Sequence, residues 1–195
     1  MFTGIIEELG RLVHIEKDGG NTHFTLEAGM TSELKIDQSL AHDGCCLTVV
    51  EIKGNQYIVT AIRETLNRTT LGNWKVGSMV NLERCMMNNG RFDGHVVQGH
   101  VDCTAICEDV QHHDGSWMFS FNYQSDHITV EKGSITINGT SLTVVDSSDN
   151  GFSVCIIPYT YENTSFKNIE KGSVVNLEFD ILGKYIMKYL KNSKF

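Results

Sequence analysis

The sequence predicts an all-β protein: two homologous six-stranded antiparallel Greek-key barrels in tandem, followed by a C-terminal α-helix. Two patterns in the 195 residues favour the barrels. One is a repeat with a constant offset of 95 residues, and the other is a series of short segments in which apolar and polar residues alternate. An apolar pattern of helical spacing near the C-terminus predicts the helix.

The repeat sets the domain organisation. The segment Asp43–Val50 recurs as Asn138–Val145, and Gly77–Glu83 returns as Gly172–Glu178 without a change of register. Such a repeat indicates two copies of one fold. We therefore expect a first barrel over residues 1–87, a polar, glycine-rich linker over 88–95, a second barrel over 96–180 and an oligomerisation helix over 181–195.

The strands follow from period-two alternation, as in His23–Glu27 and Trp117–Phe121. Clusters of turn residues separate such segments at a spacing typical of antiparallel barrels rather than of βαβ units. About six strands fit in each copy. Short helices are expected near residues 31–34 and 64–71 and at the equivalent positions one repeat later, and His112–Gly115 is expected at a hairpin tip.

The last segment differs from both copies. Asp180 is a predicted N-cap. The apolar side chains that follow it form two adjacent rows of a helix, and no equivalent exists in the first copy. This stripe must pack on the same chain or on another subunit, and we favour an oligomer contact. Its members are Ile181, Leu182, Tyr185, Ile186, Tyr189 and Leu190.

Composition narrows the classes of partner. With 24 acidic against 16 basic residues the formal charge is -8, so we expect no nucleic-acid partner. Apolar runs last only a few residues, which argues against a membrane helix. The start Met1–Glu8 has no basic region, so no secretion signal is expected and the protein is predicted to be cytoplasmic. The adjacent pair Cys45–Cys46 is a poor disulfide geometry, and the six cysteines are expected to be reduced.

Four motifs carry a resemblance to a known family. They are Met1–Ile6, Gly44–Val49, Gly94–Asp102 and Ser141–Val144. Together, and in this order, they resemble the alpha-type riboflavin synthase family over the whole chain. The resemblance implies tandem lumazine-binding barrels, a homotrimer with active sites between subunits, and no cofactor. No metal is expected, because the spacing of Cys103 and Cys107 with the nearby histidines matches no closed Cys/His pattern. Lumazine proteins share this fold, so a non-catalytic lumazine- or flavin-binding protein is the alternative.

The implied reaction is a dismutation of two molecules of 6,7-dimethyl-8-ribityllumazine, a small-molecule substrate. One molecule transfers a four-carbon unit to the other, giving riboflavin and 5-amino-6-ribitylamino-uracil. Two identical substrates doing different work suggest that chemistry lies where equivalent positions of the repeat differ. Such positions include Cys46 against Ser141, Ile5 against His100, Arg63 against Pro158 and Asp37 against Lys132.

The resemblance implies Cys46, His100, Ser141 and Thr143 as catalytic residues. His100 suits a base or proton shuttle because its ordinary pKa is near neutrality. Cys46 or Ser141 would position or supply the nucleophile at C7, as would a water molecule or a ribityl hydroxyl. The implied substrate-binding residues are Gly4, Ile5, Ile6, Cys46, Leu47, Thr48, Thr60, Ala61, Ile62, Arg63, Glu64, Thr65, Gly99, His100, Val101, Lys132, Ser141, Leu142, Thr143, Ile156, Ile157, Pro158, Tyr159, Thr160 and Tyr161.

Two departures from the family pattern stand out. Asn138 occupies a position where the second barrel often carries Asp, which weakens any mechanism that needs a carboxylate there. The segment Ile157–Tyr161 puts Tyr where a Glu-Thr-Leu pattern is more usual. The paired Glu83 and Glu178 close matching strands, and we expect them to be solvated or structurally paired rather than catalytic.

Overall fold

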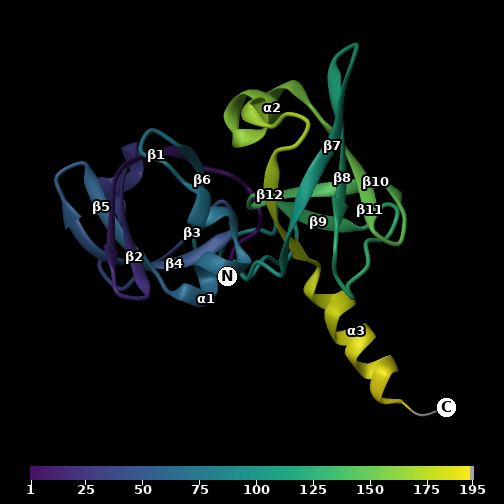
Figure 1. The fold of residues 1–195 in the computed structure, drawn as a ribbon, viewed down its shortest axis with the longest axis horizontal. Helices are drawn as coiled ribbons and strands as arrows, with labels where there is room; N and C mark the ends of the chain where they lie inside the picture. Colours follow the sequence, from purple (N-terminus) through teal and green to yellow (C-terminus); the bar gives the residue numbers. More distant parts are fainter. Residues whose placement is uncertain (194–195) are drawn as a thin grey trace.

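The computed structural model describes residues 1–193 and contains two closed antiparallel barrels of six strands each, which confirms the predicted fold class (Figure 1). The cyclic strand order β1-β2-β5-β4-β3-β6 recurs in the second barrel as β7-β8-β11-β10-β9-β12. The first barrel comprises β1 (Glu8–Asp18), β2 (Asn21–Glu27), β3 (Ser39–His42), β4 (Cys45–Lys53), β5 (Gln56–Ala61) and β6 (Met79–Arg84). The second comprises β7 (Cys103–His113), β8 (Ser116–Tyr123), β9 (Ser134–Ile137), β10 (Thr140–Ser147), β11 (Gly151–Ile156) and β12 (Val174–Phe179).

Short helices cover the barrel ends. The first copy holds η1 (Gly29–Glu33), α1 (Arg63–Arg68) and η2 (Thr70–Asn73), and the second holds α2 (Pro158–Asn163) and η3 (Ser165–Asn168). The predicted short helix at residues 126–129 is wrong, because that segment is not helical. In the first copy the Glu8 carboxylate accepts the Gly29 and Met30 N–H groups that begin η1. Cys103 stands at the position equivalent to Glu8 and offers no carboxylate.

The predicted C-terminal helix is α3 (Ile181–Asn192). The Asp180 carboxylate caps it by accepting the Leu182 N–H at 2.9 Å. Figure 1 shows α3 projecting away from the second barrel. Within residues 1–193, no helix combines the length and the apolar character needed to cross a membrane.

The two barrel cores differ in chemistry. In the first, His42 and Tyr57 are fully buried and hydrogen-bonded, with 3.0 Å between the His42 Nε2 and the Tyr57 hydroxyl. His42 Nδ1 donates to the Leu40 carbonyl, so Nε2 accepts from Tyr57. Burial lowers the pKa of His42 to about 4, which keeps the ring neutral. The second barrel has Ile137 and Phe152 at the equivalent positions and is purely apolar there.

Repeat-equivalent residues meet where the two barrels join. The Phe2 N–H donates to the Val97 carbonyl at 2.7 Å, and the Val97 N–H donates back to Phe2 at 3.1 Å. Gly44 and Gly139 touch so closely that a Cβ on Gly44 would lie 2.7 Å from the Gly139 nitrogen. Each pair consists of one position and its counterpart 95 residues later. The barrels are therefore related by a pseudo-twofold axis that passes through both contacts.

Two buried asparagines fix this junction. The Asn81 Oδ1 accepts the Ser165 N–H, and the Asn176 Oδ1 accepts the Thr70 N–H, both at 2.7 Å. Each asparagine lies on one barrel and each accepted N–H belongs to the other. Because these side chains are about 1% exposed, their hydrogen bonds form in a water-poor interface. The relative placement of the barrels thus rests on matched, fully satisfied polar contacts.

Candidate functional site

Each barrel has one place where neighbouring strands stop pairing. The paired register of β4 and β5 runs from their hairpin to Val49 opposite Val59, although both strands continue further. In the second barrel the β10–β11 register likewise ends at Val144 opposite Val154. We call residues 46–48 with 60–62 the first seam, and residues 141–143 with 155–157 the second seam. The Cys46 and Ser141 N–H groups and the Ile62 and Ile157 carbonyls are hydrogen-bonded elsewhere, whereas other backbone groups that face the gap have no cross-strand partner and are available to a planar heterocycle.

Most of the predicted substrate-binding residues lie at the seams. Side chains alternate, so Leu47 points into the barrel while Thr48 is exposed. Ile62 and Ile157, at equivalent positions at the ends of the seams, are 55% and 60% exposed and offer apolar surface. The first seam and the start of α1 bring together Cys46, Leu47, Thr48, Thr60, Ala61, Ile62, Arg63, Glu64 and Thr65; the second seam and α2 bring together Ser141, Leu142, Thr143, Ile156, Ile157, Pro158, Tyr159, Thr160 and Tyr161.

The remaining predicted segments cross between the barrels. The Gly99 carbonyl accepts the Cys46 N–H at 2.8 Å, and Val101 packs against the core of the first barrel. In the same way the Gly4 carbonyl accepts the Ser141 N–H at 2.8 Å. Each seam is therefore bordered by the N-terminal segment of the other repeat.

This arrangement divides the predicted catalytic residues into two groups. Cys46 and the segment of His100 meet at the first seam, whereas Ser141 and Thr143 lie on β10 at the second. One chain thus carries the predicted catalytic residues in two separate groups of different composition.

Burial raises the pKa of the Cys46 thiol, and a hydrogen bond from Ser39 acts in the opposite direction. Since an unperturbed thiol already ionises above neutral pH, Cys46 is protonated at pH 7. Ser39, which the sequence analysis did not single out, is therefore a polar neighbour of the Cys46 thiol. A protonated thiol suits a role in positioning the substrate better than one as a resident thiolate.

His95 is a further residue that the sequence analysis missed as a functional group. Its Nδ1 lies 2.6 Å from the Ser141 hydroxyl and its Nε2 lies 3.1 Å from the Thr136 hydroxyl. Burial lowers the pKa of His95, an effect that the negative charge of Asp180 opposes. A neutral imidazole between two hydroxyls can exchange protons with Ser141. Its sequence signal was its place in the Gly94–Asp102 motif, at the last position of the predicted linker, where the first copy has no residue to match it.

Lys132 is placed away from the second seam. Its backbone, at φ 62°, donates to the Val144 carbonyl at 2.9 Å on the edge of β10 that faces β9. Asp37 repeats this geometry in the first barrel, with φ 67° and a bond to Val49. The side chain of Lys132 is exposed. Within one chain, Lys132 thus lies beside β10 but is not part of the second seam.

Asn138 lies at the barrel junction, where its side chain makes a structural hydrogen bond. Its Oδ1 accepts the Asn176 N–H at 2.8 Å, and Asp43 accepts the Asn81 N–H at 2.9 Å in the same way. Burial raises the pKa of Asp43 to about 7, opposed by hydrogen bonds from Asn81 and from the Trp74 indole. Ile169 replaces Trp74 in the second copy and has no side-chain N–H to donate. A neutral amide fits that site because a carboxylate there would lack the indole donor.

Tyr161 packs on the wall of the second barrel. Its ring stacks on Trp117 with centroids 4.0 Å apart and planes 1° apart. Leu66 and Thr22 occupy the equivalent places in the first barrel, where Leu66 packs on the core. The second barrel therefore has the stacked rings of Tyr161 and Trp117 where the first barrel has Leu66 and Thr22.

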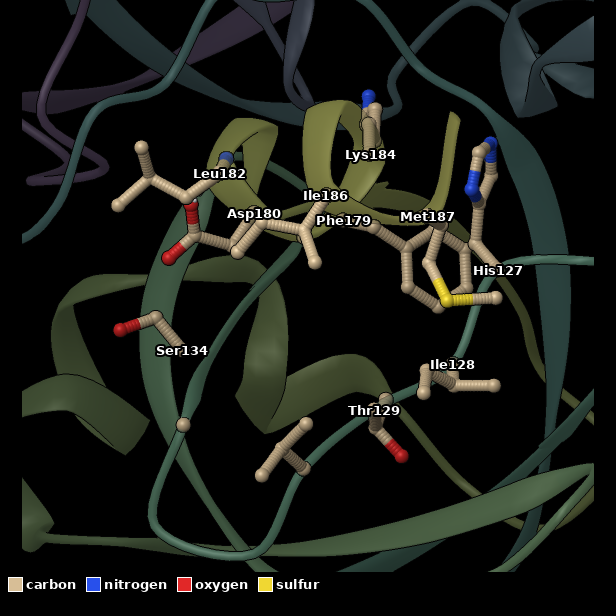
Figure 2. A pocket seen from close by; sticks show the side chains of 13 residues that line it. His127, Ile128, Thr129, Ser134, Phe179, Asp180, Leu182, Lys184, Ile186 and Met187 are labelled. Atoms are coloured by element: carbon tan, nitrogen blue, oxygen red, sulfur yellow. Dashed lines mark hydrogen bonds between the residues drawn. The ribbon is translucent and has the colours of Figure 1, made fainter. Parts of the chain in front are cut away.

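An apolar groove lies between α3 and the loop of residues 127–134 (Figure 2). Its volume is about 250 Å³, and Phe179 and Met187 help to line it, whereas the predicted substrate residues lie elsewhere. Lys184 fixes α3 to the barrel through a 2.6 Å ion pair with Asp102. The apolar stripe of α3 nevertheless stays exposed, with Tyr185 and Tyr189 each 72% accessible. An exposed stripe of this kind marks a contact surface.

Comparison with known proteins decides the family. The lumazine binding domain matches residues 3–85 and again residues 98–180. Riboflavin synthase from Actinobacillus pleuropneumoniae is 45% identical over 193 residues, which cover 97% of this chain and 90% of the relative. The chain belongs to the riboflavin synthase family. Riboflavin synthase from Bacillus amyloliquefaciens is 39% identical over 197 residues, covering 100% of this chain and 92% of that protein.

The riboflavin synthase fold also appears in a solved structure of LumP complexed with 6,7-dimethyl-8-(1'-D-ribityl) lumazine. It superposes with a TM-score of 0.84 at 24% identity, over 92% of this chain and 99% of that chain. At this identity the likeness supports the tandem-barrel fold alone.

Proposed function

We propose that this chain is a riboflavin synthase, a transferase that converts two molecules of 6,7-dimethyl-8-ribityllumazine into riboflavin and 5-amino-6-ribitylamino-uracil. The observation that carries the proposal is the presence of two equivalent seams in a chain of the riboflavin synthase family. Each seam offers free backbone edges to one copy of the same planar substrate. A dismutation needs two such sites, one for the donor and one for the acceptor of the four-carbon unit.

The non-identical residues of the seams suit unequal roles. His100 at the first seam is the group we assign to proton transfer at the acidic C7 methyl of a bound lumazine. At the second seam, Ser141 with His95, and with Thr143 on the same strand, forms a hydroxyl–imidazole pair that orients or activates the group added at C7. Cys46 positions the substrate as a protonated thiol. Holding two substrates in fixed geometry supplies much of the rate enhancement.

We further propose that the working enzyme is a homotrimer with active sites between subunits. The two seams of one chain lie on different barrels, and each is open beside an exposed isoleucine. A first seam that faces the second seam of a neighbouring chain would enclose two lumazines. The exposed stripe on α3 is the surface we assign to contact between copies. Repeated around a ring, such a head-to-tail contact closes into a cyclic oligomer.

We place the protein in the cytoplasm, which agrees with its six free cysteines. We keep residues 1–87 and 96–180 as the two lumazine-binding units, 88–95 as the linker and 181–195 as the oligomerisation segment, of which residues 194 and 195 lie outside the described part of the chain.

The test is to mix the purified protein with 6,7-dimethyl-8-ribityllumazine, without metal or added cofactor, and to follow riboflavin absorbance. The proposal predicts many turnovers, with one riboflavin formed for each two lumazines consumed. Tight lumazine binding without conversion would contradict it and would indicate the non-catalytic binding protein instead.

A further inference from the structure

Two buried glutamates hold the crossing segments. Glu83 and Glu178 occupy equivalent positions near the ends of β6 and β12 and are 4% and 3% exposed. The Glu178 carboxylate accepts the N–H groups of Gln98 at 2.7 Å and of Gly99 and His100 at 2.9 Å. Glu178 is thus structurally paired, as expected, and its partners are backbone amides. These hydrogen bonds replace those to water that a buried charge would lose.

Glu83 repeats the arrangement on the other side. Its carboxylate accepts the N–H groups of Thr3 at 2.7 Å and Gly4 at 3.0 Å, together with the Thr3 hydroxyl at 3.0 Å. Burial raises the pKa of Glu83, while the hydrogen bonds act in the opposite direction. Both glutamates therefore serve as fixed acceptors for a short stretch of backbone.

The held segments act on the opposite barrel. Glu178 belongs to the second barrel, but the segment it holds borders the first seam through the Gly99–Cys46 hydrogen bond. Glu83 belongs to the first barrel, but its segment borders the second seam through Gly4 and Ser141. The position of each seam's border is thus set by a carboxylate from the other barrel.

We propose that Glu178 is a positioning residue that fixes the backbone of His100 at the first seam, and that Glu83 does the same for residues 3–5 at the second seam. The His100 N–H is itself bonded to Glu178, so the side chain that we assign to proton transfer starts from an anchored backbone. This inference rests on the proposed function, because His100 matters only where lumazine binds.

Replacing Glu178 by Gln isolates the role. The side chain keeps its size, but one acceptor oxygen becomes an NH₂ group that faces N–H donors. At least one of the three backbone N–H groups then loses its partner and the segment shifts. A shift of about 1 Å at a reacting group costs up to about 100-fold in rate.

The experiment is a double-mutant cycle. We expect Glu178→Gln to lower kcat about 10-fold or more with a smaller change in KM, and the variant carrying both Glu178→Gln and His100→Ala to turn over within about threefold of His100→Ala alone. Glu83→Gln is the matched control, since it changes an equally buried carboxylate at the other seam. Its effect on kcat should multiply with that of His100→Ala.

If the effects of Glu178→Gln and His100→Ala on kcat multiply in the double variant, the proposal is overturned, because Glu178 would then act on the fold alone. Thermal midpoints of the two glutamine variants show whether both lose similar stability. If Glu178→Gln does not fold, the cycle is run with Glu178→Asp, which keeps the charge but shortens the reach. If the wild-type protein makes no riboflavin, the proposed function fails, and the same cycle read as the Kd for lumazine still tests the positioning role.

Discussion

The N–H of Cys46 donates a 2.8 Å hydrogen bond to the carbonyl of Gly99, which joins the first seam to a segment of the second repeat. Gly99 adopts a φ of +78°, and a Cβ added to it would lie 2.6 Å from the Cys46 Cβ. Only glycine allows both the backbone conformation and the approach. The contact joins the motif of Cys46 to the motif of His100 in the folded chain.

Gly99→Ala should therefore destabilise the protein by about 3 kcal/mol or more, from overpacking added to an unfavourable φ, and should displace the border of the first seam. Urea unfolding and lumazine binding measure the two effects. Gly19→Ala is the control: Gly19 has a φ of +57° but open space around it, so it should cost only about 1 kcal/mol and leave binding unchanged. Equal losses in the two variants would show that the close approach has no energetic weight.

Asn138→Asp tests the explanation of the departure at that position. Like the carboxyl of Asp43, the new buried carboxyl should have a pKa well above its ordinary value. A carboxyl group whose pKa is higher in the folded than in the unfolded state makes the protein less stable as the pH rises from the unfolded-state pKa to the folded-state pKa. The variant should lose about 1 kcal/mol per pH unit relative to wild type between pH 5 and 7. Riboflavin formation at pH 5 should stay close to wild type; a large gain in turnover would mean that a carboxylate there is catalytic.

The sequence predicts the repeat and the barrels well because a constant offset and period-two alternation can both be read directly along the chain, without knowledge of tertiary contacts, and Asp180 marks the start of α3. Residues 126–129 were misassigned because η1 depends on Glu8, a distant side chain that the second copy lacks. The seams carry the motifs of Cys46 and Ser141, yet their composite nature could not be predicted, since it depends on crossing segments. His95 was missed because its role arises from contacts with residues more than 40 positions away.

The buried pair of His42 and Tyr57 should make stability depend on pH. Because the folded pKa of His42 is lowered to about 4 from an ordinary value of 6.5, protonation favours the unfolded state. Stability is complete above pH 6.5 and falls as the pH drops towards 4. The double variant His42→Ile with Tyr57→Phe copies the second barrel and should remove this dependence, so wild type should lose about 1 kcal/mol per pH unit relative to it over that range. If urea unfolding gave parallel plots of stability against pH for the wild type and the double variant, the buried imidazole would not be neutral.

The exposed stripe of α3 should control assembly. Ile186 is 59% exposed, and Ile186→Asp would bury a charge in any contact between helices. We expect sedimentation velocity to show smaller particles with loss of riboflavin formation and an unchanged far-UV circular dichroism spectrum. Lys188→Asp places the same carboxylate on another side of the helix and should leave the oligomer intact. An undisturbed oligomer in Ile186→Asp would remove α3 from the interface.

The most direct test of the two half-site account is complementation between subunits. His100→Ala disables the first seam and Ser141→Ala the second, and each variant alone should be nearly inactive. Co-expressed with different tags and purified as mixed trimers, they should regain about a third of the wild-type rate of riboflavin formation, because one of the three contacts in every mixed ring pairs an intact first seam with an intact second seam. No recovery in verified mixed oligomers would contradict active sites built from two subunits.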